Sequence, residues 1–473
     1  MKAMFRGRMP RLHFIGIGGI GMSGIAEILL RHGYVVSGSD LNSNEVTQRL
    51  EALGAKVFRG HAAQNLDDAE VVVVSTAIGD DNPELLRARA ENLPVVHRGE
   101  MLAELMRLKN GIAIAGSHGK TTTTSIVAHV LATAGLDPMA VVGGVVKNFG
   151  SNAKTGVGDF LVAEADESDG SFLQLLPTIA VVTNIDPEHL EHYPGGFPQL
   201  LAAFQTFVNS IPFYGLAVLC ADHPNLRALF SSVKKRYVTY GLDGGDYTLT
   251  ELRTEPAGVS FVPVRRGEAL PRVTFPMIGA HHAQNALAVL AIADEIGIDF
   301  AIYKKALASF EGVGRRFELK GQVGSIAVYD DYGHHPAEII ATLTGARHAF
   351  LSQPVVGPWR RLVVVFQPHR YTRTRDLLRE FGRAFDAADV VILTDVYAAG
   401  EAPIPGISGE TIFAEVQRTS PVSVHYVADK MAVATVLHRE VRAGDLVLTL
   451  GAGDIHKSGE QLLRLLEQEA AHG

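Results

Sequence analysis

The chain of 473 residues is poor in cysteine, with Cys220 as its only one. A single thiol cannot form an internal disulfide, so the protein is compatible with a reducing compartment. Apolar runs are short, and none approaches the roughly 20 residues that a membrane-spanning helix needs. Residues 1–11 are basic, but no apolar segment of about 7–15 residues follows them, so we expect no secretion signal. These absences predict a cytoplasmic protein without a membrane partner.

Basic residues are not in surplus either. The chain has 43 lysines and arginines against 51 aspartates and glutamates, which gives a net charge of −8. Nucleic-acid binding needs basic side chains to neutralise phosphates, so this balance argues against a nucleic-acid partner. The apolar fraction of 47% and charged fraction of 20% are those of an ordinary globular protein. The length predicts about three domains of about 150 residues each.

The strongest local pattern is GSHGKTTTT at residues 116–124. The apolar run before it, residues 112–115, predicts a buried strand, and residues 125–131 after it predict a helix. A strand, a glycine-rich loop and a helix together form the setting of a phosphate-binding loop. In such a loop, backbone N–H groups and the helix N-terminus attract phosphate.

Two side chains of this loop fit phosphoryl-transfer chemistry. Lys120 can reach the β- and γ-phosphates of a nucleotide, and the Thr121 hydroxyl can bind Mg²⁺. The spacing is tighter than in the usual GxxxxGK[ST] pattern, because two residues separate Gly116 from Gly119. The context nevertheless predicts a nucleotide site.

A second glycine-rich loop, GIGGIG at residues 16–21, lies near the start of the chain and matches GxGxxG. A strand predicted over residues 35–40 ends at Asp40, 19 residues beyond Gly21, which is near the spacing at which an acid meets a ribose in Rossmann domains. The motif shows only that a pyrophosphate can lie at a helix N-terminus, and a UDP-sugar carries a pyrophosphate just as NAD does. The residues therefore leave both ligands open.

Acidic segments follow two buried strands in the middle of the chain. EADESD (residues 164–169) follows one strand, and IDPEHL (residues 185–190) follows another. Ligands of open α/β sheets bind beyond the carboxyl ends of the strands, so these segments point toward the phosphates. Glu164 suits Mg²⁺, which prefers oxygen ligands. His189 is less usual for Mg²⁺, and the residues alone favour capping of a helix or packing in the core.

Alternating strands and helices predict an α/β protein of three domains. We expect a Rossmann-like domain over residues 1–108 and a central P-loop ATPase-type parallel sheet over residues 109–320. A second Rossmann-like domain is expected over residues 321–473. Polar residues follow each of four apolar strands in this last domain, at residues 326–329, 362–366, 390–394 and 446–450.

Taken together, these motifs resemble the Mur ligase family, the ATP-dependent amide-bond-forming enzymes of peptidoglycan synthesis. The resemblance covers nearly the whole chain and is carried by residues 16–24, 39–40, 97–101, 116–124, 164–169, 183–189, 279–285, 330–336 and 369–375. It implies one domain each for the UDP-substrate, ATP and the amino acid. Within the family, the alanine-adding branch is most similar. This implies ligation of L-alanine to UDP-N-acetylmuramate through an acyl phosphate, with ATP and Mg²⁺ as cofactors and with ADP and phosphate as products.

The resemblance also implies roles for individual residues. The expected ATP-binding residues are Gly116, Ser117, His118, Gly119, Lys120, Thr121, Thr122, His281, Asn285 and Arg315, with Arg316 as an alternative to Arg315. The expected UDP-substrate residues are Gly18, Gly19, Ile20, Gly21, Ser39, Asp40 and His97. The expected Mg²⁺ ligands are Thr121, Glu164 and His189. The expected catalytic residues are Lys120, Glu164, His189, His335, Arg370 and Arg373, of which the last three would meet the muramoyl carboxylate and the amino acid.

One departure separates this chain from several sister ligases. Those enzymes carry a carbamylated lysine beyond the position of His189 that supports a second Mg²⁺, whereas residues 195–209 here contain no lysine. This absence resembles the alanine-adding branch.

Three alternatives remain open. A muropeptide-recycling ligase would add a tripeptide to the same nucleotide sugar, although the GIGGIGM of the first loop favours the alanine enzyme. An NAD(P)-dependent oxidoreductase would use the first loop and Asp40, but has no use for Lys120. A nucleotide-gated binding protein would perform no chemistry. The sequence leaves the oligomeric state open, a homo-oligomer included.

Overall fold

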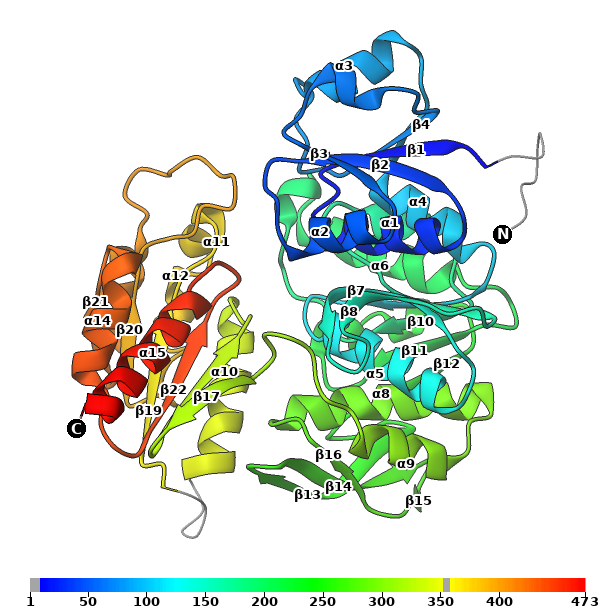
Figure 1. The fold of residues 1–473 in the computed structure, drawn as a ribbon. Helices are drawn as coiled ribbons and strands as arrows, with labels where there is room; N and C mark the ends of the chain where they lie inside the picture. Colours follow the sequence, from blue (N-terminus) through cyan, green and yellow to red (C-terminus); the bar gives the residue numbers. More distant parts are fainter. Residues whose placement is uncertain (1–8, 352–357, 473) are drawn as a thin grey trace. The chain divides into compact units, whose positions relative to one another are not determined.

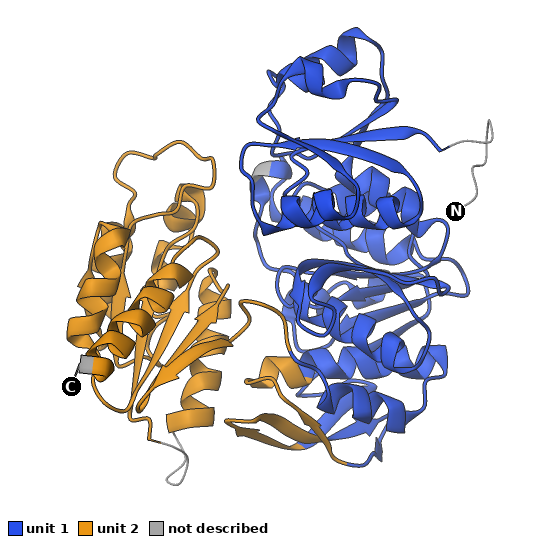
Figure 2. Cartoon of the chain, viewed as in Figure 1, with its two compact units in different colours: residues 1–250, 262–271, 284–311 blue, residues 251–261, 272–283, 312–473 orange. Residues whose placement is uncertain are grey.

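The computed structural model describes residues 9–351 and 358–472, and these residues form three β-sheets with intervening helices (Figure 1). The α/β class predicted from the sequence is confirmed. Most of the basic N-terminal segment, residues 1–8, lies outside the described residues. The chain divides into two compact units, described separately here (Figure 2). Unit 1 holds residues 1–250, 262–271 and 284–311, and unit 2 holds residues 251–261, 272–283 and 312–473.

The N-terminal domain contains a parallel sheet in the order β3-β2-β1-β4-β5. Its elements are β1 (Arg11–Ile15), α1 (Ile20–Arg31), β2 (Val35–Asp40), α2 (Glu45–Ala52), β3 (Lys56–Arg59), β4 (Val71–Val74), α3 (Pro83–Ala90), β5 (Val95–His97) and α4 (Arg98–Met106). The chain moves away from β1 in one direction and returns to β4 on its other side. This strand order places the first glycine loop, which follows β1, at the topological switch point.

As in the N-terminal domain, strands alternate with helices in the central domain. Its first elements are β6 (Asn110–Ala115), α5 (Lys120–Thr133), β7 (Met139–Val146), β8 (Ser151–Thr155), β9 (Phe160–Glu164), β10 (Ile179–Val182), α6 (Phe197–Asn209), β11 (Leu216–Cys220), α7 (Pro224–Arg227) and β12 (Tyr237–Tyr240). β6 lies between β9 and β10, and all three run parallel. The carboxyl ends of these strands therefore meet at one edge, where the second glycine loop begins.

Short strands and two helices complete the central domain. They are β13 (Tyr247–Glu255), β14 (Gly258–Arg265), β15 (Glu268–Ala269), β16 (Val273–Phe275), α8 (Ala280–Ile296) and α9 (Phe300–Ala308). β14 pairs antiparallel with both β15 and β16.

The C-terminal sheet has the order β17-β18-β22-β19-β20-β21, with β17 antiparallel to its neighbour. Its elements are β17 (Glu318–Val323), β18 (Ile326–Asp331), α10 (Pro336–Ala346), β19 (Arg361–Phe366), α11 (Tyr371–Asp376), α12 (Leu378–Phe381), β20 (Val390–Leu393), α13 (Gly409–Thr419), β21 (Ser423–Tyr426), α14 (Lys430–Glu440), β22 (Asp445–Leu450) and α15 (His456–His472). β17 begins before residue 321, so the boundary predicted at residues 320/321 falls inside this strand.

An aromatic cluster anchors α6 in the central domain. The ring of Phe172 lies 5.2 Å from the rings of both Phe204 and Phe207, centroid to centroid, and all three side chains are buried. Such contacts add packing energy beyond the area that they bury. Among the described residues, no helix combines the length and apolar character that crossing a membrane requires.

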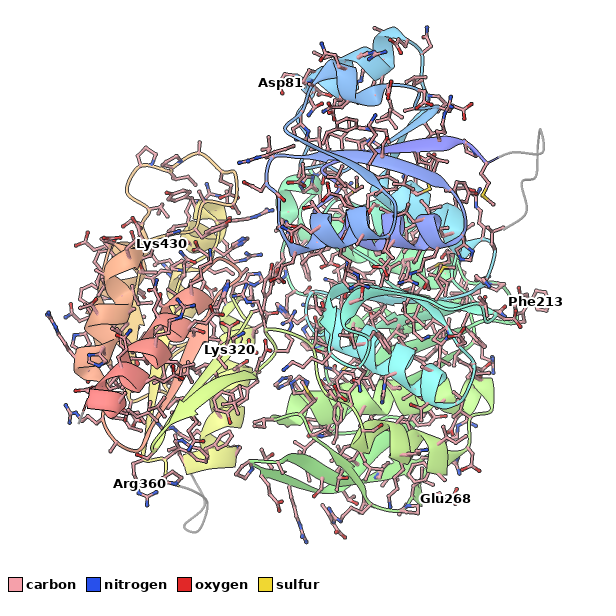
Figure 3. All side chains as sticks on the ribbon, viewed as in Figure 1. Asp81, Phe213, Glu268, Lys320, Arg360 and Lys430 are labelled. Atoms are coloured by element: carbon pink, nitrogen blue, oxygen red, sulfur yellow. The ribbon has the colours of Figure 1, made fainter. Side chains whose placement is uncertain are left out.

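We expect Phe204→Ala to lower the free energy of unfolding by about 3–5 kcal/mol, because it leaves a cavity beside two other rings. Urea titration of the purified protein measures this change. Phe213 is the matched control, because its ring is 89% exposed (Figure 3). Phe213→Ala should change the unfolding midpoint very little, and equal losses in the two variants would contradict the assignment of this core.

Candidate active site

The second glycine loop needs its glycines for steric reasons. Gly116 has a φ of 129° and Gly119 a φ of 82°, both in the region that side chains disfavour. A Cβ atom at Gly116 would collide with the Thr183 hydroxyl, and one at Gly119 would lie 3.2 Å from Oδ1 of Asn285. The loop thus packs tightly against the end of β10 and against α8.

Hydrogen bonds hold this loop in shape. The backbone N–H of His118 donates to Oδ1 of Asn184 at 2.7 Å, and that of Ser117 donates to the Asn184 carbonyl at 3.2 Å. The Thr183 hydroxyl donates to the His118 carbonyl at 2.6 Å. The first turn of α5 begins directly after the loop, and its N–H groups have no partners within the helix. Such a helix N-terminus suits an anion, and binding of phosphate here remains a prediction.

The Lys120 ammonium is held entirely by oxygens of unit 1. Nζ donates to Oε1 and Oε2 of Glu167 at 2.8 and 2.9 Å and to the Gly116 carbonyl at 2.5 Å. Burial alone would lower the pKa of Lys120, but the carboxylates of Glu167 and Asp166 outweigh burial and raise it. Lys120 therefore stays charged. A phosphate that binds this lysine must exchange with the Glu167 carboxylate, which is itself buried.

Oxygen donors suited to Mg²⁺ lie around the loop. The Thr121 hydroxyl makes no hydrogen bond within the part of the chain that the structure describes, which leaves it available as a ligand. Glu164 ends β9, and its Oε1 accepts the Gly143 N–H at 2.5 Å. His189 follows β10 with a φ of 55°, and its Nε2 lies 3.6 Å from Oε2 of Glu188. A hydroxyl and a carboxylate are ligands of the kind that Mg²⁺ prefers, and Thr121, Glu164 and His189 as its ligands remain a prediction.

Two histidines flank a carboxylate beside the loop. Oδ2 of Asp186 lies 3.3 Å from Nε2 of His118, and Oδ1 lies 3.2 Å from Nε2 of His223. Burial raises the pKa of Asp186, but the hydrogen bonds from both histidines outweigh burial and hold it well below its usual value. His118 also lies 3.3 Å from Oε1 of Glu188. No pattern in the sequence points to His223, because its partner Asp186 lies far from it along the chain.

The first glycine loop is bound by Asp40. The Gly18 N–H donates to Oδ2 of Asp40 at 3.0 Å, and the Gly16 N–H donates to the Ser39 carbonyl at 2.8 Å. Ile20 is 44% exposed at the start of α1. Asp40 therefore shapes the loop by accepting from its backbone, in addition to any contact with a ligand.

Ser39 points into the N-terminal domain rather than to its surface. It is fully buried, and its hydroxyl donates to Oε2 of Glu84 at 2.5 Å while lying 2.8 Å from Nδ1 of His61. Glu84 is also fully buried and accepts from Asn65 and from the Ala62 N–H. The expected substrate residue Ser39 is thus part of a buried polar network, whereas His97 is exposed at the end of β5.

In unit 2, basic and aromatic side chains gather after β18 and β19. The ring of His369 stacks on Tyr397 with centroids 5.7 Å apart, and lies 5.4 Å from the ring of His334. Nη1 of Arg373 lies 3.3 Å from Nδ1 of His369. Burial, together with nearby basic groups, lowers the pKa of His369 to about 3, so this ring is neutral near pH 7.

Two further expected residues sit at helix starts in this unit. His335 is buried and caps α10, where its Nδ1 accepts the Ala337 N–H at 3.3 Å. Arg370 precedes α11 with a φ of 71°, and its N–H donates to the Tyr397 carbonyl at 2.9 Å. The structure therefore brings Arg370 and Arg373 to the same short helix beside His369.

Arg315 is tied to the C-terminal sheet. Its guanidinium donates to Oδ2 of Asp330 at 2.8 Å and to the carbonyls of Gly451 and Gly453 at 2.6 and 3.0 Å. Both arginines lie over the Tyr332 ring, with Arg315 at 5.1 Å and Arg316 at 5.5 Å from its centroid, and Nη1 of Arg316 lies 3.9 Å from Oε1 of Glu338. A role for Arg315 at ATP remains a prediction. The guanidinium of Arg316 is bound less tightly by the protein than that of Arg315.

The remaining expected nucleotide residues lie at the start of α8. His281 and Asn285 are four residues apart, which places them on one face of the helix. Burial and the charge of Arg316 lower the pKa of His281 to about 4, so its ring is neutral near pH 7.

Family comparisons agree with this layout. The "Mur ligase family, catalytic domain" matches residues 11–110, the "Mur ligase middle domain" residues 114–293, and the "Mur ligase, glutamate ligase domain" residues 315–453. The chain belongs to the Mur ligase family. The resemblance stated from the sequence is thereby confirmed. The domain boundaries predicted from the sequence, at residues 108/109 and 320/321, remain predictions.

Similar Mur ligases cover nearly the whole chain. A UDP-N-acetylmuramate–L-alanine ligase of Anaeromyxobacter sp. (strain Fw109-5) is 56% identical over 98% of this chain and 100% of its own length. The crystal structure of UDP-N-acetylmuramate-alanine ligase MurC from Thermotoga maritima is 31% identical, with a TM-score of 0.83 over 98% of this chain and 100% of that chain. A murein peptide ligase from Psychrobacter arcticus 273-4 shares the fold at 24% identity and a TM-score of 0.71, covering 97% and 99% of the two chains.

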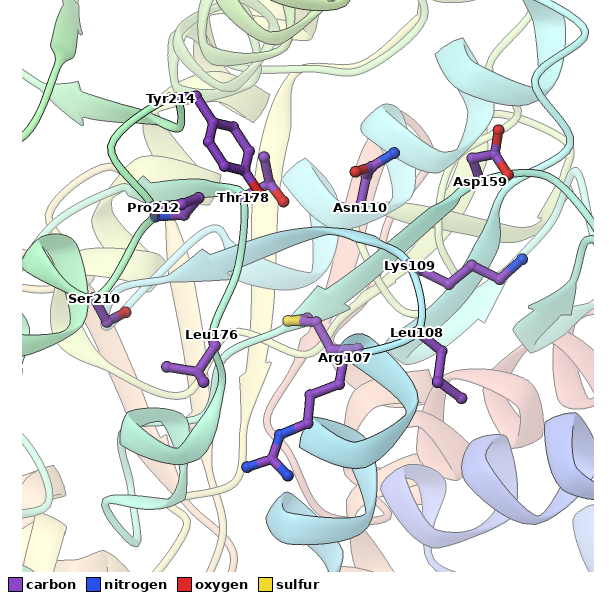
Figure 4. Close-up of a pocket in the computed structure, with 11 residues that line it drawn as sticks. Arg107, Leu108, Lys109, Asn110, Asp159, Leu176, Thr178, Ser210, Pro212 and Tyr214 are labelled. Carbon is purple, nitrogen blue, oxygen red and sulfur yellow. The ribbon is translucent and has the colours of Figure 1, made fainter. Parts of the chain in front are cut away.

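This Mur ligase also has a cavity of about 620 Å³ in unit 1 (Figure 4). Asn110, Asp159 and Thr178 line it, and each lies where a strand of the central sheet begins. The glycine loop and the acidic segments lie where the same strands end. The cavity is therefore at the opposite edge of the sheet from the candidate nucleotide site.

We expect Asp186→Asn to destabilise this Mur ligase by about 1–3 kcal/mol at pH 7, because the exchange removes the charge that two histidines face. The pKa of Asp186 is lowered on folding, so its stabilisation is present above the usual value of 3.8 and is lost as the pH falls below it. Urea unfolding of both proteins at pH 7 and pH 3 measures this. A difference that stays constant between the two pH values would contradict the assignment.

Proposed function

We propose that this chain ligates L-alanine to UDP-N-acetylmuramate with hydrolysis of ATP to ADP and phosphate, in the synthesis of peptidoglycan precursors. The muramoyl carboxylate attacks the γ-phosphoryl group of ATP and forms an acyl phosphate with release of ADP. The amine of L-alanine then attacks the acyl carbon, and phosphate leaves from the tetrahedral intermediate. The single observation that carries the proposal is the 56% identity, over the full length, with a relative named for this reaction.

The geometry of the second glycine loop supports the first step. Phosphoryl transfer needs positioning and neutralisation of charge more than covalent chemistry. The loop offers backbone N–H groups at the start of α5, and Lys120 lies at the same place with its charge held by Glu167. If phosphate oxygens replaced the Glu167 carboxylate, the Lys120 ammonium would keep a negatively charged partner throughout binding. The proposed ATP contacts are the loop residues together with Asn285, His281 and an arginine at 315 or 316.

Thr121, Glu164 and His189 are the residues that would hold Mg²⁺. When bound, Mg²⁺ neutralises charge on the transferring phosphoryl group. The chain's own part is to present one hydroxyl, one carboxylate and one imidazole at the carboxyl edge of the central sheet.

The C-terminal cluster supports the second step. Arg370 precedes α11 and Arg373 lies on it, and their positive charges suit the carboxylates of an amino acid and of a muramoyl group. The neutral rings of His369 and of its neighbour Tyr397 form an uncharged wall beside them. The two arginines can therefore bind carboxylates, and the two rings beside them add no further charge.

The muropeptide-recycling reaction is the alternative within the family. It uses the same nucleotide sugar, so the two reactions differ in the amine that is accepted. The oxidoreductase alternative is not supported, because all three domains match ligase models. The experiment is release of ADP with UDP-N-acetylmuramate and ATP against a panel that contains L-alanine, glycine, L-serine and the tripeptide. Release with the tripeptide and not with L-alanine would overturn the proposal.

Lys120→Ala should lower turnover by at least about 10³-fold, the scale of a key charge in phosphoryl transfer. The substitution also leaves Glu167 as a buried carboxylate without its cation, which alone can disturb folding. The double variant Lys120→Ala/Glu167→Gln removes that charge. If the double variant regains near-normal ADP release, Lys120 is not the phosphate-binding lysine.

Activity should not depend on dissolved CO₂. Residues 197–209 form α6, and no lysine lies between residues 195 and 209 that could carry a carbamate near His189. Turnover in degassed, bicarbonate-free buffer should equal turnover with added bicarbonate at constant pH and ionic strength. A several-fold rescue by bicarbonate would show that a lysine elsewhere is carbamylated, and the proposed Mg²⁺ ligands would then be incomplete.

A further inference from the structure

His223 lies at the carboxyl edge of the central sheet, in the same row as the second glycine loop. Strands β6, β10 and β11 are neighbours in this order and run parallel, with Ala115, Val182 and Leu219 in register. The segments that follow these strands therefore start side by side at one edge. They carry the glycine loop after β6, Asp186 after β10 and His223 after β11.

Both ring nitrogens of His223 contact the segment that follows β10. Nδ1 accepts the Ile185 N–H at 3.4 Å, and Nε2 lies 3.2 Å from Oδ1 of Asp186. A ring nitrogen that accepts a hydrogen bond carries no proton, so the proton of this imidazole is on Nε2. His223 therefore donates to the Asp186 carboxylate, and the backbone of Ile185 selects the tautomer that can do so.

The other oxygen of Asp186 faces the glycine loop. Oδ2 lies 3.3 Å from Nε2 of His118, and the Asp186 N–H donates to the Ser117 hydroxyl at 2.8 Å. Burial raises the pKa of Asp186, but the hydrogen bonds from both histidines outweigh burial and lower it, so the carboxylate is charged. Each carboxylate oxygen is thus directed at one histidine, and Asp186 connects His223 to two consecutive residues of the loop.

A charged carboxylate beside a phosphate-binding loop needs such a restraint. Carboxylate and phosphate repel each other, and this repulsion is stronger where little water screens it. The side chains of His118, Asp186 and His223 are only 15%, 25% and 20% exposed. With His223 in place, both oxygens of Asp186 are engaged by imidazoles. Without it, Oδ1 would lose its donor, and the carboxylate could rotate and release His118.

We propose that His223 is a positioning residue for the ATP loop: its Nε2–H holds the Asp186 carboxylate, which in turn orients His118 and keeps the loop in its phosphate-binding conformation. This inference rests on the proposed function, in which the loop binds ATP. It adds His223 as a residue that acts through Asp186 without touching the nucleotide. Asn225 of α7 supports the same segment, because its Nδ2 donates to the Ile185 carbonyl at 2.9 Å.

Steady-state kinetics with ATP as the varied substrate tests this proposal, together with isothermal titration of the full chain with ADP. His223→Ala should raise the KM for ATP by about 10-fold, the scale of one hydrogen bond to a charged group, and weaken ADP binding to a similar extent. The KM for L-alanine should not change. His438→Ala is the control, because His438 pairs with Glu469 in the C-terminal domain, and it should leave all three values unchanged.

Two amide variants separate positioning from a structural role, because each replaces one nitrogen of the ring. His223→Asn keeps an acceptor for the Ile185 N–H at the position of Nδ1 and suits the start of α7, but offers no donor at the position of Nε2. His223→Gln can still donate to Asp186. We therefore expect His223→Gln to have the lower KM for ATP and His223→Asn to have the higher urea midpoint of unfolding.

A double-mutant cycle tests whether His223 acts through Asp186. In Asp186→Ala, His223 has no carboxylate to hold, so the added His223→Ala substitution should not raise the KM for ATP further. Additive effects would show that His223 acts independently of Asp186 and would overturn the proposal. A KM for ATP that is equal in His223→Asn and His223→Gln would also contradict it.

Failure of this inference is distinguishable from failure of the proposed function. If the wild-type chain releases no ADP with UDP-N-acetylmuramate, ATP and L-alanine, the proposed function fails. If the wild-type chain turns over but His223→Ala and His223→Asn keep its KM for ATP and its affinity for ADP, this inference alone fails. A lowered urea midpoint with an unchanged KM for ATP would then show that His223 serves stability only.

Discussion

Unit 1 is organised around one buried cation, the ammonium of Lys120. A buried charge is stable only when opposite charge and hydrogen-bond acceptors surround it. The loop carbonyl of Gly116 supplies one acceptor, and Glu167 supplies two more from the segment that follows β9. The Tyr193 hydroxyl in turn donates to the Glu167 carbonyl at 2.5 Å and fixes the backbone there. The ammonium of Lys120, which is proposed to bind phosphate, therefore also holds the loop, the edge of the sheet and the acidic segment together.

The acidic segment that follows β9 also joins the N-terminal domain to the central domain. Asp166 binds Arg98 from α4, while Asn152 and Ser151 of β8 contact α1 through Ile20 and Glu27. These contacts explain why the N-terminal and central domains form one compact unit, while the C-terminal sheet belongs to another.

Sequence patterns predicted most of the fold because they are local. The runs at residues 112–115 and 362–366 are uninterrupted stretches of apolar residues, and both are central strands. Short or polar strands escaped prediction: β17 (ELKGQV) and β3 (KVFR) are exposed edge strands, and their register depends on the neighbouring strand. The polar residues that follow strands lie at the carboxyl edge of the sheet, as predicted, because neighbouring parallel strands all end at that edge.

The amino-acid sequence was enough to predict the apolar strands, the two glycine loops and the family, because each motif that carries them is a short contiguous segment. Tertiary structure alone decided which polar side chains meet. Ser39 donates to the buried Glu84, His223 contacts Asp186, and Arg98 donates to Asp166 across a domain boundary. Arg315 and Arg316 are adjacent and chemically equal in the sequence, yet only Arg315 is bound to Asp330. The reason is that a charged side chain is satisfied by whatever lies within about 3 Å of it in space, and strand order rather than chain order sets those neighbours.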